Sequence, residues 1–403
     1  MREWLQRASF VFLSFILAIL LTSPAFSGQF LEVKADFPPE GRSSLAAEKG
    51  RRIQATFINP GISDSNNPTG TFWLSVSAFM QAAANDLDID LEIIYSERNH
   101  ILMKEQARSV ASRVTPPDVV LVVNEKLAAS EMVKIFDKAG IKVFVLLNTF
   151  DDSQAREMGK PRAKFPSYLG SLVPDNTAAG YLVARKLFSK ARHEGHGAAG
   201  GKIEVIAING DYVTPAAIAR NVGLQLAVNE TEGIDLRQEF VGQWSRDKAH
   251  IQAEGAFLRY PGISVIWAAN DPMALGALDA VRKVGKIPGK DVMIGGVNWD
   301  LPALLEVRDG GLVVTAGGHF MTGAWALVLL YDYYHGRDFA EIGTELQLPL
   351  FNSLDRQSVV RYLAVFGDGN WGKIDFRKFS KTMNPDLQQY DFSLESVYGK
   401  LVQ

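Results

Sequence analysis

Asparagine recurs where short apolar runs of the sequence end. A run rich in Val, Ile and Leu, such as VVLVV at residues 119–123, is followed by one in each case. An amide offers two donors and two acceptor lone pairs on a short stem, which suits ligand hydroxyl groups that both give and receive hydrogen bonds. Asparagine is also a common turn residue and helix cap, so each single position is open to either interpretation. The positions are Asn59, Asn124, Asn148, Asn209, Asn270 and Asn298.

Three aromatic side chains and an arginine are candidates for the same site. Phe72 and Trp73 begin a predicted helix after a long polar loop, and Trp244 follows a predicted strand. The C–H face of a sugar packs well on such rings. Arg220 lies in a helix expected to begin near Pro215, and its planar guanidinium can donate to two adjacent oxygens. The ordinary alternatives are a core or interface position for the rings and a solvated one for the arginine.

Asp271 has two candidate roles. It is suited to pair with Arg220 or to accept from a ligand hydroxyl. Because it precedes Pro272, it is equally suited to cap the start of a helix.

The sequence around these residues predicts alternating strands and helices. Residues 265–300 have the pattern strand, helix, strand, and the second apolar run ends at Asn298. A crossover of this length returns the chain to the same edge, so the two strands are expected to be parallel. Open α/β sheets bind ligands beyond the carboxyl ends of their strands, which is where the asparagines stand.

The alternation runs in two halves, which predicts two lobes. We expect an α/β protein with two doubly wound parallel-sheet lobes joined by a hinge. The expected N-terminal lobe comprises residues 51–172 plus 318–345, and the C-terminal lobe comprises 173–317. Residues 346–403 are expected to form a return strand and a C-terminal tail of helix and loop.

Composition supports this organisation and excludes other classes. A chain of 403 residues is too long for one ordinary core, and 47% hydrophobic with 22% charged residues is typical of a soluble globular protein. With 42 basic and 45 acidic residues, the chain has a net charge of -3 and lacks the excess of positive charge that is typical of nucleic-acid-binding proteins. The absence of cysteine excludes disulfides and lipid attachment at cysteine.

The first 27 residues resemble a secretory signal peptide. Arg2 and Arg7 precede an apolar run at residues 8–21, which is followed by small residues up to Ser27. A retained anchor is the alternative, but the run is shorter than the roughly 20 residues that span a bilayer. We expect cleavage near Ser27 and a periplasmic protein.

Other local patterns do not point to chemistry. His193 and His196 lack the spacing of a zinc protease, and the glycine-rich stretch at 197–202 precedes a strand where a phosphate loop precedes a helix. We find no Ser/His/Asp set and no pair of carboxylates whose pattern in the sequence alone would indicate catalysis. We therefore expect no enzyme, no metal and no cofactor.

The stretch AANDPMALGALDAVRKVGK followed by DVMIGGVNW resembles the type I periplasmic solute-binding proteins, the ribose and galactose binders. The likeness implies their two-lobed fold, which can be followed from about residue 51 to 350. It also implies ligand contacts at Asn124, Asn148, Asn270 and Asn298, and at Phe72, Trp73, Trp244 and Arg220. Asn59 and Asn209 are then turn formers.

The first loop, the stretch LLNTF around Asn148, and Arg220 also resemble the quorum-signal receptor that binds autoinducer-2, a furanosyl borate diester. That receptor uses a second arginine on its return crossing, where this chain has Gly317, Gly318 and His319. His319 is either a ligand contact or a hinge histidine bonded to backbone.

These observations predict a monomeric binding protein that closes two lobes over a small sugar-like ligand. The resemblance implies an inner-membrane ABC permease as partner, and a membrane sensor (a kinase, cyclase or chemoreceptor) as the alternative. A transcription factor would need a basic DNA-binding segment where this chain has an export signal.

Overall fold

Each lobe is built on a six-stranded sheet. The computed structural model describes residues 51–402, which all lie within one compact unit, and the predicted signal segment lies outside them. The first sheet contains, in spatial order, β11 (Glu345–Leu348), β5 (Tyr168–Pro174), β4 (Lys142–Leu146), β3 (Val119–Val123), β1 (Ile53–Asn59) and β2 (Ile89–Tyr95). The second contains β12 (Asn352–Leu354), β10 (Val314–Gly317), β9 (Met293–Asn298), β8 (Ile263–Ala268), β6 (Ile203–Asn209) and β7 (Ile234–Val241).

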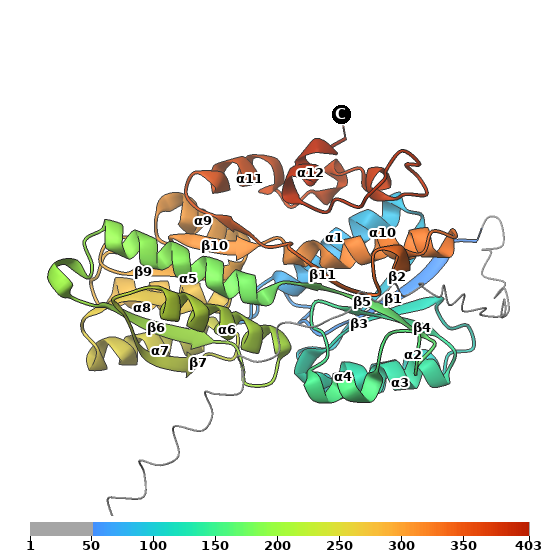
Figure 1. The fold of residues 1–403 in the computed structure, drawn as a ribbon, viewed down its shortest axis with the longest axis horizontal. Coiled ribbons are helices and arrows are strands. Elements are labelled where there is room, and N and C mark those ends of the chain that lie inside the picture. The colour runs from blue at the N-terminus through green and yellow to red at the C-terminus, as the bar shows by residue number, and fades with distance from the viewer. Residues whose placement is uncertain (1–50, 403) are drawn as a thin grey trace, which may run out of the picture. The chain divides into compact units, whose positions relative to one another are not determined.

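Strand pairing is parallel throughout both sheets except between β10 and β12, which are antiparallel. The prediction of two parallel-sheet α/β lobes is therefore confirmed. Figure 1 shows the two sheets side by side, each with helices on its faces.

Helices cover both faces of each sheet, which explains the unbroken apolar runs. Along β3, Val119, Leu121 and Val123 join the core under α1 (Phe72–Asp86) and α10 (Thr322–Tyr334). The alternate residues Val120 and Val122 join a second core under α2 (His100–Ala111) and α3 (Ala129–Lys138). A strand buried on both faces has no position for a polar residue.

The second lobe repeats the arrangement. Helices α5 (Asn176–His193) and α6 (Pro215–Glu230) pack against each other, as do α7 (Arg246–Arg259) and α8 (Asp271–Lys283). The remaining elements are α4 (Asp152–Met158), α9 (Leu301–Asp309), α11 (Ser358–Phe366) and α12 (Leu394–Gly399), with 3-10 turns η1 (Glu125–Leu127), η2 (Ala198–Gly200), η3 (His319–Met321), η4 (Phe339–Glu341), η5 (Trp371–Lys373) and η6 (Phe376–Phe379). Within residues 51–402, no helix is long and apolar enough to cross a membrane.

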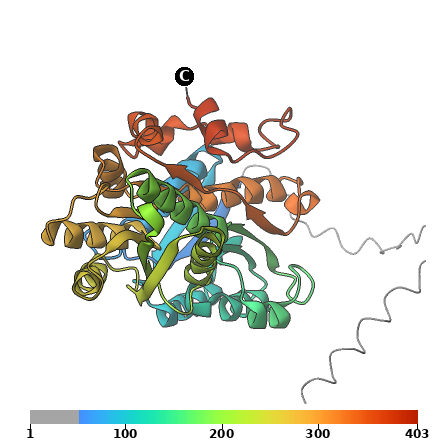
Figure 2. The same ribbon diagram turned by 60° about the vertical axis from the view of Figure 1, so that its left-hand side comes forward.

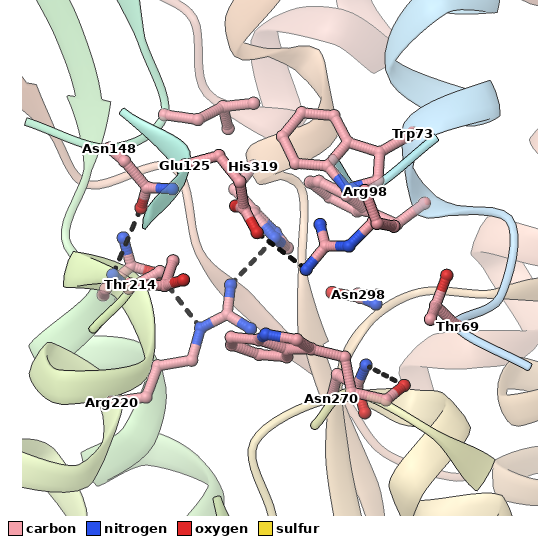
Figure 3. Close-up of a pocket in the computed structure, with 15 residues that line it drawn as sticks. Thr69, Trp73, Arg98, Glu125, Asn148, Thr214, Arg220, Asn270, Asn298 and His319 are labelled. Carbon is pink, nitrogen blue, oxygen red and sulfur yellow. Dashed lines mark hydrogen bonds and ion pairs between the residues drawn. The ribbon is translucent and has the colours of Figure 1, made fainter. Parts of the chain in front are cut away.

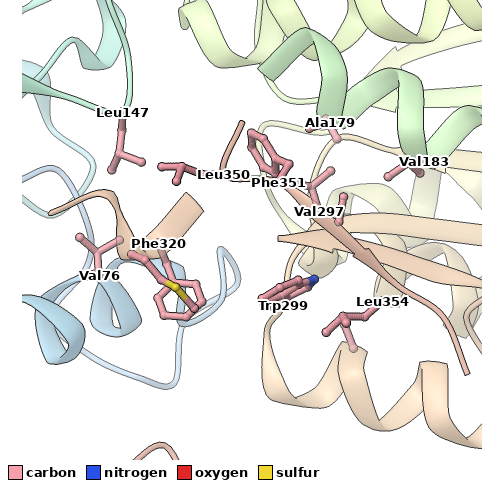
Figure 4. Close-up of a cluster of buried hydrophobic side chains, with 14 of the residues drawn as sticks. Val76, Leu147, Ala179, Val183, Val297, Trp299, Phe320, Leu350, Phe351 and Leu354 are labelled. Atoms are coloured by element: carbon pink, nitrogen blue, oxygen red, sulfur yellow. The ribbon is translucent and has the colours of Figure 1, made fainter. Parts of the chain in front are cut away.

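The chain passes between the lobes three times. It leaves the first sheet after β5, returns after β10, and crosses again between β11 and β12. The third crossing carries Leu350 and Phe351, which lie between the buried side chains of the two lobes in Figure 4. Only the first two crossings were expected from the sequence, and the assignment of residues to lobes stays a prediction.

Two helices and one cap differ from the expectations. Residues 151–166 are rich in charged residues and proline, which is typical of a polar loop, but they contain α4, which begins with a capping box between Asp151 and Gln154. Helix α9 follows β9 directly and was not predicted, although Pro302 and Gly310 mark its ends. The cap of α8 is Asn270, whose side chain accepts from the backbone N–H of Met273, and Asp271 is the first helical residue.

Candidate ligand-binding site

A cavity lies at the carboxyl ends of strands from both sheets. Its empty space, mouth included, is about 570 Å³. Figure 3 shows Trp73, Arg98 and Glu125 from the first lobe facing Arg220 and Asn270 from the second. The lining residues are Thr69, Phe72, Trp73, Arg98, Glu125, Leu147, Asn148, Asn176, Thr214, Ala216, Arg220, Trp244, Asn270, Asn298 and His319.

The structure brings eight of the ten predicted site residues to this cavity. They are Phe72, Trp73, Asn148, Arg220, Trp244, Asn270, Asn298 and His319. Asn124 does not line it, because its amide donates to Thr149 and Gln154 and accepts from the N–H of Ala129. Asp271 is fully buried beneath it. Its carboxylate accepts from the Thr315 hydroxyl and the Asp300 N–H, at 2.7 and 3.0 Å.

Arg220 is the centre of the polar network. Its side chain is 4% exposed and donates from Nε to Asn176 Oδ1 at 3.0 Å and from Nη1 to the Ala269 carbonyl at 2.7 Å. Burial lowers its pKa to about 9, so the guanidinium stays charged at neutral pH, and the charge of Asp271 opposes the shift. The helix that carries it is fixed closely on α5, since a Cβ at Gly180 would lie 1.9 Å from the Arg220 carbonyl oxygen.

His319 completes this network as a neutral imidazole. Its ring lies between those of Phe72 and Phe351, stacked on the first and tilted to the second, with both centroid distances 4.5 Å. Burial holds the pKa of His319 well below its usual value, and the charge of Arg220 lowers it further. The Nε2 atom therefore accepts from Arg220 Nη2 at 3.1 Å, and the other ring nitrogen carries the proton. The sequence left two roles open for His319, a ligand contact or a hinge histidine bonded to backbone. The structure records a ring hydrogen bond to Arg220 and none to backbone.

Each of the two tryptophans packs against a glycine, and Trp244 also has a polar partner. Trp73 packs against Gly61, where a Cβ would lie 2.2 Å from the Trp73 Cβ. Trp244 packs against Gly210, and its Nε1 donates to Asp211 Oδ2 at 2.8 Å. Close approach of each ring therefore requires glycine at the facing position.

Four lining residues other than glycine have left-handed backbone. They are Arg98, Leu147, Trp244 and Asn298, with φ of 58°, 63°, 63° and 148°. Such conformations are costly for side chains other than glycine and cluster at binding sites that the surrounding fold stabilises. Each of the four directly ends a strand or follows it closely, so the strain lies where the sheets meet the cavity.

The most polar lining residues that sequence reasoning missed are Arg98 and Glu125. Their side chains form an ion pair of 2.8 Å, with exposures of 18% and 2%. Burial raises the pKa of Glu125, the positive charge of Arg98 lowers it, and the charge of Asp211 across the cavity raises it. Glu125 follows Asn124 at a predicted strand end, so its position was available from the sequence, whereas its partnership with Arg98 was not.

The two lobes are in contact across the cavity, and we call this arrangement the closed state. The N–H of Ala216, at the start of α6, donates to Asn148 Oδ1 at 3.2 Å. The N–H of Arg246 donates to the Pro68 carbonyl at 3.0 Å. The loop before α1 therefore reaches the second lobe and covers one side of the cavity, which Thr69 lines.

A buried pair of carboxyl groups lies beneath the cavity. Asp300 is 5% exposed, and its backbone N–H donates to Asp271. Burial raises the pKa of both groups, and the charge of Asp300 adds to the shift at Asp271. Folding therefore makes both carboxyls bind protons more strongly than they do in the unfolded chain.

We expect the difference in free energy of unfolding between Asp300→Asn and the wild type to shift in favour of the variant as the pH rises. A carboxyl whose pKa is raised by folding contributes stability that is present below about pH 4 and is lost as the pH rises through the raised pKa. The variant lacks this loss, so its free energy of unfolding should improve on the wild type by roughly 2 kcal/mol between about pH 5 and 8. Denaturant unfolding across that window measures the difference.

The control is Asp309→Asn on the same helix. The hydrogen bond from Arg308 lowers the pKa of Asp309, so this group titrates below the window and its variant should follow the wild-type profile. A profile of Asp300→Asn that is likewise parallel to the wild type would contradict the prediction.

Comparison with known proteins agrees with this architecture. Residues 64–338 match the family model described as periplasmic binding protein domain. The D-allose-binding periplasmic protein of Escherichia coli is 35% identical over 291 residues, which are 72% of this chain and 86% of that protein. The ribose import binding protein of Salmonella typhimurium is 28% identical over 256 residues, 63% of this chain and 76% of that protein.

A solved structure is similar as well. The crystal structure of a periplasmic sugar-binding protein from Pseudomonas fluorescens is 38% identical, with a TM-score of 0.77, and covers 86% of this chain and 99% of its own. Two α/β lobes closed over a polar cavity define a solute-binding protein. The chain belongs to the type I periplasmic binding proteins, the family of the ribose- and allose-binding proteins.

Proposed function

We propose that this protein captures a neutral, sugar-like polyhydroxyl ligand between its lobes in the periplasm and delivers it to an ABC permease. The observation that carries the proposal is the composition of the closed cavity. Two indoles, three amides of predicted site residues and a buried guanidinium converge on it from both lobes. Rings suit the C–H faces of a sugar, and amides with a guanidinium suit its hydroxyl edge.

Charge balance favours a neutral ligand. Arg98 and Glu125 form an ion pair of 2.8 Å, and the buried Asp271 provides the negative charge that acts on Arg220. An anionic ligand such as a borate diester would need a further cation at the return crossing, where the chain has Gly317, Gly318 and His319. The pKa of His319 is lowered well below its usual value, so the imidazole does not supply that charge.

Closure provides the selectivity. A buried amide that is left without a partner costs about 1–3 kcal/mol, so a sugar with a misplaced hydroxyl binds less well in the closed state. The ligand shifts the lobes toward this state by its differential affinity. A membrane partner can then recognise the closed form, and the names of the related import proteins support a permease in that role.

We expect the mature chain from residue 28 to be stabilised by one sugar of a panel. The panel includes D-ribose, D-allose, xylitol and autoinducer-2, each read by thermal shift and then by calorimetry. A ligand at 100 times its dissociation constant should add about 2.7 kcal/mol of stability. Asn148→Ala should abolish the response, and Asn229→Ala, on the exposed end of α6, should leave it unchanged.

Further measurements separate the alternatives. Recovery of the sugar unchanged after prolonged incubation supports a binding role over an enzymatic one. Restored uptake in a strain that carries the cognate permease supports transport, and restored signalling without uptake supports a sensor.

The mass of the protein in a periplasmic extract tests cleavage near Ser27. A panel without any stabilising member, at concentrations of several millimolar, would contradict the proposed ligand class.

A further inference from the structure

The C-terminal residues 352–402, which we call the strap, continue past the last crossing and attach to both lobes. Strand β12 pairs with β10 in the second sheet, and α11 packs on α9. The ring of Tyr362 on α11 lies 4.8 Å from that of Trp299, and Asp355 pairs with Lys186 on α5 at 3.3 Å. This first half of the strap therefore belongs to the second lobe.

The second half is attached to the first lobe by aromatic packing. Trp371 and Phe376 each lie 5.2 Å from Phe79 of α1, measured between ring centroids. Phe379 and Phe392 each lie 4.8 Å from Trp325 of α10. Figures 1 and 2 show α11 over the second lobe and α12 beyond it, so the segment runs along one side of both lobes.

A buried carboxylate anchors this second half. Asp332 of α10 is fully buried and accepts from the Ser380 hydroxyl at 2.5 Å, from the Tyr390 hydroxyl at 2.7 Å, and from the N–H groups of Lys381 and Thr382 at 2.8 and 3.0 Å. A buried carboxylate that accepts four hydrogen bonds is costly to separate from its donors.

The halves are joined through space as well as through the chain. Arg361 of α11 donates to Glu395 of α12 at 2.9 Å, and its guanidinium lies 3.9 Å from the ring centroid of Tyr398. The ring of Phe366 lies 5.7 Å from that of Tyr398 and 5.4 Å from that of Trp371. The covalent link is the exposed loop at residues 367–370.

We propose that the strap is a brace that favours the closed state and thereby sets the affinity and release rate of the interlobe site. Opening rotates α9 with the second lobe away from α1 and α10 of the first. The strap is packed against both lobes, so this rotation must displace α11 relative to α9 or relative to α12. Packed interfaces resist such a continuous displacement, and the strap therefore opposes opening. These contacts occur together with the hydrogen bonds across the cavity, from Ala216 to Asn148 and from Arg246 to Pro68.

The consequence for binding is quantitative. A ligand that binds the closed state has an apparent dissociation constant that falls as the closed fraction of the free protein rises. A brace that stabilises the closed state therefore tightens binding and slows release without touching the ligand. This inference rests on the proposed function only for its effect on affinity, because the effect on lobe opening requires no ligand.

Lobe opening can be measured directly because the chain contains no cysteine. Lys138→Cys on α3 and Asn229→Cys on α6 place one spin label on each lobe at exposed positions. A protease site inserted at residues 367–370 allows the strap to be cut in the folded protein, and Tyr398→Ala removes the ring that contacts Arg361 and Phe366 across the cut. The matched control carries the same site in the loop at 194–202, which lies within the second lobe.

We expect the cut strap with Tyr398→Ala to shift the distances of the ligand-free protein to longer values and to weaken binding by about tenfold. The control cut should change neither. Distances that are identical before and after the cut, with the protein folded by circular dichroism, would overturn the brace. Uncut Tyr398→Ala with Glu395→Ala should give a smaller shift in the same direction. A shift without sugar binding by either form supports the brace and contradicts the proposed function.

Discussion

Replacement of Arg220 by methionine is expected to abolish ligand binding and to destabilise the protein. Methionine leaves Asn176, the Ala269 carbonyl and His319 without their shared donor. It also leaves the buried carboxyl group of Asp271 without the positive charge of Arg220. Removal of one partner from a buried charge network costs about 3–5 kcal/mol, which denaturant unfolding of the variant measures.

Two further variants separate stability from recognition. Arg220→Lys keeps the positive charge but lacks the planar guanidinium. The variant should therefore fold, but its affinity for the ligand should be lower by about tenfold or more. Arg282→Met removes a surface arginine whose partner is Glu306, and it should cost no more than about 1 kcal/mol and leave binding intact. Wild-type affinity in Arg220→Lys would mean that the guanidinium supports the lobe and does not read the ligand.

The sheets and the strand-end asparagines were predictable because they depend on local pattern. Runs such as that of β3 are apolar at every position because both faces of the strand are covered, and that signal is unaffected by distant residues. Asn148, Asn270 and Asn298 follow from the rule that parallel sheets bind ligands at their carboxyl ends. The family resemblance then placed Arg220 and the two tryptophans.

Side-chain partners and backbone strain were not predictable in the same way. Asn124 has the same local setting as Asn148, yet Gln154 on an unexpected helix satisfies it, so only one of the two reaches the cavity. The pair of Arg98 and Glu125 joins two strand ends that are separated by a helix. Left-handed residues such as Leu147 have no sequence signature, because the fold imposes their conformation.

The strap shows a third limit of local reasoning. Its aromatic residues were visible in the sequence, but their pattern has no helical or strand period that would name a partner. The rings of Trp371 and Phe379 pack on α1 and α10, about 300 and 50 residues earlier in the chain, which only the assembled fold brings near. A lobe-by-lobe interpretation therefore missed that the tail connects both lobes.

The second large effect is expected from Trp244→Ala, which should weaken ligand binding by about 100-fold. The indole lines the cavity from the second lobe, and its Nε1 bond to Asp211 holds the ring plane in position. Loss of an aromatic face that packs on a ligand removes both contact area and the orientation of the ring. Because the side chain is only partly buried, the variant should unfold close to the wild type.

Two controls make this result specific to the ring in the cavity. Trp244→Phe keeps an aromatic face without the bond to Asp211, so its affinity should lie between those of the wild type and the alanine variant. Tyr212→Ala removes a ring that is 83% exposed in the same part of the lobe and does not line the cavity, so calorimetry should give wild-type affinity. If Trp244→Ala binds within about threefold of the wild type, the ring does not contact the ligand, and the site must be rebuilt around Trp73 and the amides.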